Sequence, residues 1–229
     1  MKVALQIFLV FLLLALSGKS AEGISQLRVG IIDVKPWGYE ESGVIRGTQI
    51  DRYRELEKES GLKFTYILLP LKRALFMLEK GQIDILSVWE REELSDFAER
   101  INTVSCDEYF VVELENTVQV NPAINFQVAV QAESNLSLNN LKSRDVKYVG
   151  VNYKQLILML HKQRFGSIRI GLSGLKSGAS ELNFPLADFR LVESLGQVKE
   201  YLYFSRLSPN FDIMLVKKLS QSIKLEVEH

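Results

Sequence analysis

The 229-residue chain has very few of the residues that build disulfides and metal sites: one cysteine and two histidines. The single Cys106 cannot form an internal disulfide, so the stability of the chain must come from its apolar core. We expect Cys106 to be a small buried hydrophobic residue rather than a reactive thiol. His161 and His229 lie far apart without neighbouring cysteines, so we expect no zinc site and no cofactor.

The chain also lacks an excess of charge of one sign. Lysine and arginine number 28, and aspartate and glutamate number 28, so the formal net charge is zero. This balance carries no electrostatic footprint of a nucleic-acid-binding protein. We therefore expect no nucleic-acid partner.

Long apolar runs are missing except at the start of the chain. Residues 3–16 are apolar apart from Gln6, which is short of the roughly 18–20 residues that a membrane anchor needs. Lys2 precedes this run, and small and polar residues follow it at 17–21. The pattern predicts a cleavable signal peptide over residues 1–21 and a periplasmic location, with a membrane anchor as the alternative. No cysteine lies near its end, which argues against a lipoprotein anchor.

Short apolar segments alternate with amphipathic ones in the first half of the chain, which predicts a parallel sheet covered by helices. In one predicted helix, Leu71, Ala74, Leu75 and Leu78 recur at helical spacing. The predicted strands, helices and connecting loop cover residues 27–33, 36–39, 47–60, 63–70, 71–81 and 82–89, and a further strand covers 104–114.

The strand–helix pattern starts again in the second half, with a strand at 147–151 and a helix at 155–164. Residues 166–180 contain four glycines and four serines without apolar periodicity, so we interpret them as a loop. A strand at 198–204 and a closing helix at 211–223 complete the chain.

An aromatic loop, Pro36-Trp37-Gly38-Tyr39, follows the first predicted strand. In parallel sheets ligands bind outside the carboxyl ends of the strands, which is where this loop falls. An indole or a phenol there can stack on a ligand or a cation. The alternative is that Trp37 closes the end of the core.

Three further motifs carry a resemblance to a known family: Gly47-x3-Asp51, Leu78-x2-Gly81-x2-Asp84, and Glu90-Arg91 with Phe97 after five more residues. With the order of the predicted elements, they resemble the family 3 extracellular solute-binding proteins, the amino-acid-binding type of periplasmic binding protein. The resemblance implies an α/β fold, a two-lobed type II clamshell with a reduced second lobe. It places residues 22–115 and 203–229 in the first lobe and 116–202 in the second.

The resemblance also implies ligand contacts in the first lobe. Trp37 and Tyr39 form one wall of the cleft, and Arg91 binds the carboxylate of the ligand through two parallel donors. Arg73 lies in a Pro-x2-Arg-Ala-Leu stretch like that of one branch of the family, where it reaches the cleft or remains an outer charge. Asp51 organises the start of its helix and is not a predicted ligand contact.

The second lobe departs from the family pattern. Val149-Gly150-Val151 is present, but Asn152-Tyr153 replaces the usual small pair, and we expect both residues to contact the ligand. We find no second Leu-x2-Gly-x2-Asp unit, which in the family supplies an aspartate for the ligand's ammonium group. The segment 166–180 stands in its place, so we expect it to be mobile and easily cut by proteases.

The leading interpretation is a monomeric solute-binding protein without catalytic residues. It captures a small polar solute, an amino acid or another carboxylate, for an ABC-type transporter of the inner membrane. One alternative is a degenerate clamshell that acts as a sensory or interaction partner. Another is a dehydratase-like enzyme, which needs a general acid near the cleft; Asp33, Glu40 and Glu41 are the candidates.

Overall fold

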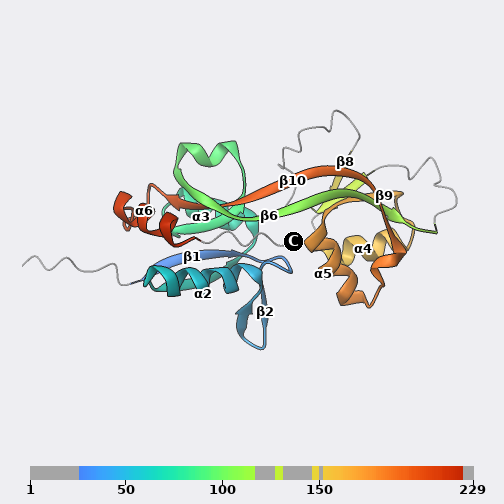
Figure 1. Cartoon of the computed structure of the whole chain (residues 1–229), viewed down its shortest axis with the longest axis horizontal. Helices are drawn as coiled ribbons and strands as arrows, with labels where there is room; N and C mark the ends of the chain where they lie inside the picture. The colour runs from blue at the N-terminus through green and yellow to red at the C-terminus, as the bar shows by residue number, and fades with distance from the viewer. Residues whose placement is uncertain (1–25, 117–126, 131–145, 150–151, 224–229) are drawn as a thin grey trace, which may run out of the picture.

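The computed structural model describes residues 26–116, 127–130, 146–149 and 152–223 (Figure 1). The predicted signal peptide at 1–21 and the glycine of the Val-Gly-Val motif lie outside the described residues. Within the described part of the chain, no helix is long and apolar enough to cross a membrane.

The elements follow one another in an order close to the predicted one. The first group is β1 (Leu27–Ile32), β2 (Tyr39–Glu41), β3 (Val44–Arg46), α2 (Thr48–Ser60), β4 (Phe64–Leu69), α3 (Leu71–Glu79), β5 (Ile85–Trp89), the short 3-10 helix η1 (Glu92–Asp96) and β6 (Ala98–Leu114). The second group is β7 (Gln127–Val130), β8 (Val146–Val149), α4 (Tyr153–His161), β9 (Ser167–Gly171), α5 (Leu172–Leu182), η4 (Leu186–Asp188), β10 (Phe189–Ser205) and α6 (Ile213–Ser222).

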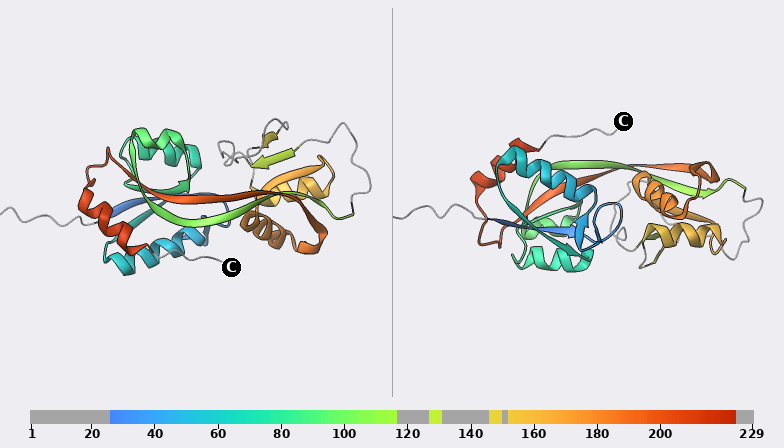
Figure 2. Two further views of the ribbon diagram at one scale, coloured as in Figure 1. Left: turned by 45° about the horizontal axis from the view of Figure 1, so that its top comes forward. Right: turned by 90° about the horizontal axis from the view of Figure 1, so that it is seen from below.

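Eight of the strands form one hydrogen-bonded sheet in the order β4-β1-β5-β10-β6-β9-β7-β8. The long antiparallel pair β6 and β10 runs along the molecule and joins two bodies (Figures 1 and 2). We call β1–β5 with α2, α3 and α6 the first lobe, and β7–β9 with α4 and α5 the second lobe. β10 pairs with β5 at one end, and β6 pairs with β9 at the other.

The sequence does not predict that the lobes share strands. It predicts strands at 104–114 and 198–204, whereas β6 and β10 each extend over 17 residues. Much of their length lies between the lobes and is partly exposed, so it carries no clear apolar pattern. The residue boundaries expected for the two lobes stay a prediction.

Alternate residues of β1 face opposite sides of the first-lobe sheet, and they are apolar on both sides. Helices therefore cover both faces of this sheet. Val29 and Ile31 pack with Ile50 of α2 and Leu219 of α6, whereas Ile32 packs on the side of α3. The core on the α3 side continues into α4, β9 and α5 of the second lobe. The two lobes are therefore in apolar contact.

The interpretation of residues 166–180 as a mobile loop is wrong. They form the buried strand β9 and most of helix α5. The glycines make the contact between α4 and α5: a Cβ atom at Gly178 would lie 2.7 Å from Ile157 Cδ1, and one at Gly174 would lie 2.8 Å from the Tyr153 ring. Small residues thus replace the apolar stripe of an ordinary amphipathic helix.

The expectation that the second lobe lacks a second Leu-x2-Gly-x2-Asp unit stays a prediction, although the helices α3 and α5 end in similar turns. After α3 the chain turns at Gly81 (φ 64°) and reaches Asp84 before β5. After α5 it turns at Asn183 (φ 55°) and reaches Asp188 before β10. Asn tolerates this left-handed conformation better than most residues, so it can replace the glycine. The acid lies five positions after the turn rather than three, so the spacing of the first-lobe motif is not repeated.

Candidate functional site

The aromatic loop is seated on the start of helix α2. The carbonyl oxygens of Pro36 and Trp37 accept hydrogen bonds from the N–H groups of Thr48 and Gln49, each at 3.0 Å. These contacts satisfy donors at the helix start, which has no side-chain cap. Gly47 has a φ of 122°, and a Cβ atom there would collide with the carbonyl of Trp37. The position of the Trp37 backbone is therefore set by α2.

The indole of Trp37 contacts aromatic rings of both lobes. Its ring lies edge-on to Trp89 at the end of β5, with 4.9 Å between centroids, and edge-on to Tyr153 at 5.3 Å. Tyr153 is the first residue of α4 in the second lobe. Trp37 is 6% exposed, Trp89 4% and Tyr153 1%, so the three rings form an apolar contact between the lobes.

A cavity of about 290 Å³ lies beside this aromatic contact, and we call it the interlobe cavity. Residues of both lobes and of the two shared strands line it. They include Trp37, Asp51, Arg52, Glu55, Trp89, Cys106, Asp107, Ser173 and Glu200. Ser173 belongs to α5, whereas Asp51, Arg52 and Glu55 belong to α2. The cavity is thus bounded by both lobes.

Glu200 of β10, a buried carboxylate, lines one side of the cavity. Its Oε2 atom accepts from Arg52 Nη2 at 2.7 Å and from Ser105 Oγ at 2.8 Å. Its Oε1 atom accepts from Gln49 Nε2 at 2.7 Å and from Ser87 Oγ. We call these five residues the Glu200 cluster. It ties α2, β5, β6 and β10 together at one point.

Burial of the Glu200 carboxyl favours its neutral form, but the nearby charge of Arg52 and three hydrogen bonds outweigh burial. The pKa of Glu200 is therefore held below its ordinary value. The carboxylate and the Arg52 guanidinium form an ion pair at 2.7 Å, with the Arg52 side chain 26% exposed and that of Glu200 5% exposed. Most of the charge of Arg52 is thus neutralised within the protein.

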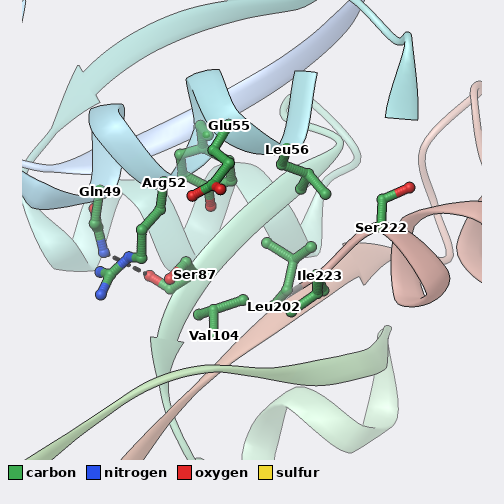
Figure 3. Close-up of a pocket in the computed structure, with 10 residues that line it drawn as sticks. Gln49, Arg52, Glu55, Leu56, Ser87, Val104, Leu202, Ser222 and Ile223 are labelled. Carbon is green, nitrogen blue, oxygen red and sulfur yellow. Dashed lines mark hydrogen bonds between the residues drawn. The ribbon is translucent and has the colours of Figure 1, made fainter. Parts of the chain in front are cut away.

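A second cavity of about 40 Å³ adjoins the first and shares Arg52, Glu55 and Val104 with it. Figure 3 shows Arg52 and Glu55 extending from α2, with Val104 and Ile223 below the helix. The dashed line in Figure 3 is the bond from Gln49 Nε2 to the carbonyl oxygen of Ser87, at 3.0 Å. This small space is large enough for a water molecule rather than for an organic solute.

Two predicted second-lobe contacts lie at the start of α4. The Asn152 side chain accepts a hydrogen bond from Gln155 N at 3.0 Å and so caps the helix. Tyr153 is buried against Trp37 and the backbone of Gly174. Neither side chain is among those that line the interlobe cavity.

The remaining predicted contacts lie in the first lobe but away from this cavity. Tyr39 is half-buried in β2, with Lys35 Nζ 4.7 Å from its ring centroid. Arg73 is exposed on the first turn of α3, with its guanidinium 5.6 Å from the Phe76 ring centroid. Of the first-lobe candidates, Trp37 lines the interlobe cavity, and Tyr39 and Arg73 do not.

Arg91 is 6% exposed and lines a different, wider groove of about 1160 Å³. Its Nη1 atom lies 3.2 Å from Glu93 Oε1. Other charges of this groove also pair with one another, as Arg100 does with Glu90. The structure does not bring Arg91 together with Trp37 in one cavity, and the role of Arg91 as a carboxylate anchor stays a prediction.

Sequence reasoning missed Arg52, Glu200 and Ser173. Glu200 carried a usable signal, because it is an acid beside the apolar run of residues 201–204. The expectation that Cys106 is buried is wrong: the residue as a whole is exposed, and it lines the interlobe cavity. Partial burial raises the pKa of this thiol, which makes it less reactive at neutral pH.

The general-acid candidates do not meet at the cavity. Asp33, Glu40 and Glu41 are exposed, and none of them is among its lining residues. Asp188, the acid that follows α5, is also absent from the lining.

Comparison with known proteins rests on structure. No family model matches the sequence, and no curated protein matches it. The periplasmic VFT2 domain of BvgS from Bordetella pertussis is similar with a TM-score of 0.67, at 14% identity, over 86% of each chain. The arginine-bound form of truncated ArgBP from T. maritima gives 0.65 at 14% identity, over 86% of this chain and 94% of that one.

The ligand-binding core of GluR0 in complex with L-glutamate gives a TM-score of 0.67 at 15% identity, over 86% of this chain and 90% of that one. The fold is therefore the type II periplasmic-binding-protein clamshell. The resemblance to the family 3 solute-binding proteins is confirmed as a structural match, and at these identities it establishes the fold.

Proposed function

We propose that this protein is a periplasmic solute-binding protein that takes one small polar solute into the interlobe cavity. The observation that supports this most is a cavity of about 290 Å³ bounded by both lobes and walled by two indoles. This volume is close to the lower end of the range of ligand pockets, roughly 300–1000 Å³. The lining combines aromatic rings with a few polar groups, as small-molecule sites do.

The structural neighbours support a binding role, because ArgBP is arginine-bound and the GluR0 core is in complex with L-glutamate. In the proposed role, the lobes close around a solute by hinge motion along β6 and β10. The protein then acts as a monomer and delivers the solute to a transporter of the inner membrane.

The chain contains its own reporters for a test. Its two tryptophans, Trp37 and Trp89, and its single cysteine, Cys106, all line the interlobe cavity. Solutes are titrated while tryptophan emission and the rate of Cys106 modification by a thiol reagent are followed. A solute that binds in the cavity should change the emission and slow the modification with one shared dissociation constant. A solute that raises the melting temperature without either change binds elsewhere.

Arg91 is tested in the same assay. If Arg91 anchors a carboxylate, Arg91→Ala should weaken binding by about 2–5 kcal/mol, because the charge of the ligand loses its partner. Equal affinity of variant and parent removes Arg91 from the site.

A second candidate function, that of a sensory or interaction domain, is favoured by the contacts between the lobes. Trp37 packs on Tyr153, and Lys35 Nζ lies 3.2 Å from Glu181 Oε2 of α5. These contacts join the two lobes through side chains of the protein itself, so the lobes can be held together without a solute. Such an arrangement suits a signalling role, and BvgS VFT2 has the same fold. In that case no solute of a broad panel should protect Cys106.

A further inference from the structure

We propose that the indole of Trp37 is a latch: it occupies a site for a flat aromatic ring between the lobes and so holds them closed. Two rings form this site, Trp89 of the first lobe and Tyr153 of the second lobe, and we call it the ring site. The inference goes beyond the proposed function, because it concerns how the lobes close and requires no external solute. The chemical class that fits the ring site is a small, flat, apolar aromatic compound.

The first lobe presents the indole on a fixed backbone. The carbonyl oxygens of residues 36 and 37 accept hydrogen bonds from the start of α2, and a Cβ atom at Gly47 would collide with the Trp37 carbonyl. The chain at Trp37 therefore cannot shift without disturbing α2. Trp89, which the indole meets edge-on, belongs to a strand whose five residues are all buried. The first-lobe half of the ring site is thus built into the sheet.

The second lobe fixes the position of Tyr153. This residue is the first of α4, and a Cβ atom at Gly174 of α5 would lie 2.8 Å from its ring. A glycine at that position leaves room for the phenol ring against the backbone of α5. Because each ring is held by packing within its own lobe, the contact between Trp37 and Tyr153 forms only when the lobes are together. Separation of the lobes breaks it.

The strength of the latch comes from contacts between apolar rings. The centroid distances of 4.9 Å and 5.3 Å and the interplanar angles of 84° and 68° lie in the favourable edge-to-face range. A second contact between the lobes, from Lys35 Nζ to Glu181 Oε2, has side chains 41% and 27% exposed, and solvent weakens such ion pairs. Loss of the indole should therefore shift the ratio of open to closed protein by about tenfold or more.

The test measures the radius of gyration by small-angle X-ray scattering, with indole as the probe. Trp37→Ala should have a larger radius of gyration than the parent. Added indole should return it to the parent value, because a free ring can fill the apolar cavity left by a deleted one. Trp37→Ala/Tyr153→Ala should also be open, but indole should not close it, since the second-lobe half of the ring site is gone.

Phe64→Ala is the matched control. Phe64 is a buried aromatic residue whose ring neighbours, Tyr53 and Tyr66, both belong to the first lobe. Its loss should lower the melting temperature and leave the radius of gyration at the parent value, with or without indole. An equal increase in the radius of gyration of Phe64→Ala and Trp37→Ala would show general loosening and would overturn the latch.

An unchanged radius of gyration in Trp37→Ala also overturns the proposal. An open variant that indole does not close does the same, because the ring itself is then not what joins the lobes. If Trp37→Ala does not fold, Tyr153→Leu replaces it: we expect a larger radius of gyration and a red shift of tryptophan emission, and an unchanged radius of gyration refutes the latch. None of these measurements needs a solute for the interlobe cavity, so the solute-binding proposal is tested separately.

Discussion

Removal of the Glu200 carboxylate should cost more stability than any exposed ion pair of the protein. In Glu200→Ala the donors of Arg52, Gln49, Ser87 and Ser105 lose their common acceptor. Breaking a buried pair by removing one partner costs about 3–5 kcal/mol. Because the Arg52 side chain is 26% exposed and stays partly hydrated, we expect the lower end, about 3 kcal/mol.

The assay is urea unfolding at pH 7, followed by tryptophan emission and by circular dichroism. The matched control is Glu99→Ala, which removes another carboxylate of a strand pair: Glu99 Oε2 lies 2.9 Å from Arg206 Nη2, with both side chains more than a third exposed. This variant should lose about 0–1 kcal/mol. A loss below about 1 kcal/mol in Glu200→Ala would refute the argument that the buried cluster stabilises the fold.

The effect of Glu200 should also depend on pH with a defined sign. Its pKa in the folded protein is lowered from the ordinary value of 4.5, so its charged form contributes stability above that value. This contribution is lost as the pH falls through the folded pKa. The difference in unfolding free energy between the parent and Glu200→Gln should therefore be constant near neutral pH and shrink below pH 4.5. A difference that grows in acid contradicts the lowered pKa.

Asn152→Ala should lower the unfolding free energy by about 1 kcal/mol, because Gln155 N loses its capping acceptor; thermal melting checks this. Gly178→Leu should destabilise by about 1–3 kcal/mol through crowding against Ile157, whereas Ser180→Ala on the exposed side of α5 should change stability by less than about 0.5 kcal/mol. Limited proteolysis should spare β9 and α5 in the folded protein, and a first cut within them would contradict their buried packing.

Much of the first lobe follows from local sequence pattern. The helix predicted at 47–60 is α2 (Thr48–Ser60), and the one predicted at 71–81 is α3 (Leu71–Glu79). The closing helix predicted at 211–223 is α6 (Ile213–Ser222). In each case apolar residues recur at helical spacing and a sheet covers the apolar face, so the pattern and the packing agree.

The second lobe shows where local pattern fails. Helix α5 uses Gly174 and Gly178 to approach α4, so the residues that make its contact have no side chains to reveal a period. A prediction based on apolar spacing assigns such a helix to a loop. Its neighbour along the chain, β9, is buried only because β6 and β7 flank it in the sheet.

The sequence by itself determined the class of fold, because strands, helices and motif spacing are local properties that a single chain displays in order. The tertiary structure alone decided the candidate site. Arg52 and Glu200 are 148 positions apart, and their ion pair exists only because β10 returns beside β5 and beneath α2. Trp37 meets Tyr153 only because the lobes are in contact, and the lining of the interlobe cavity combines residues from α2, β6 and β10. The composition of such a cavity depends on which distant segments of the chain become neighbours, and a local sequence pattern does not contain this information.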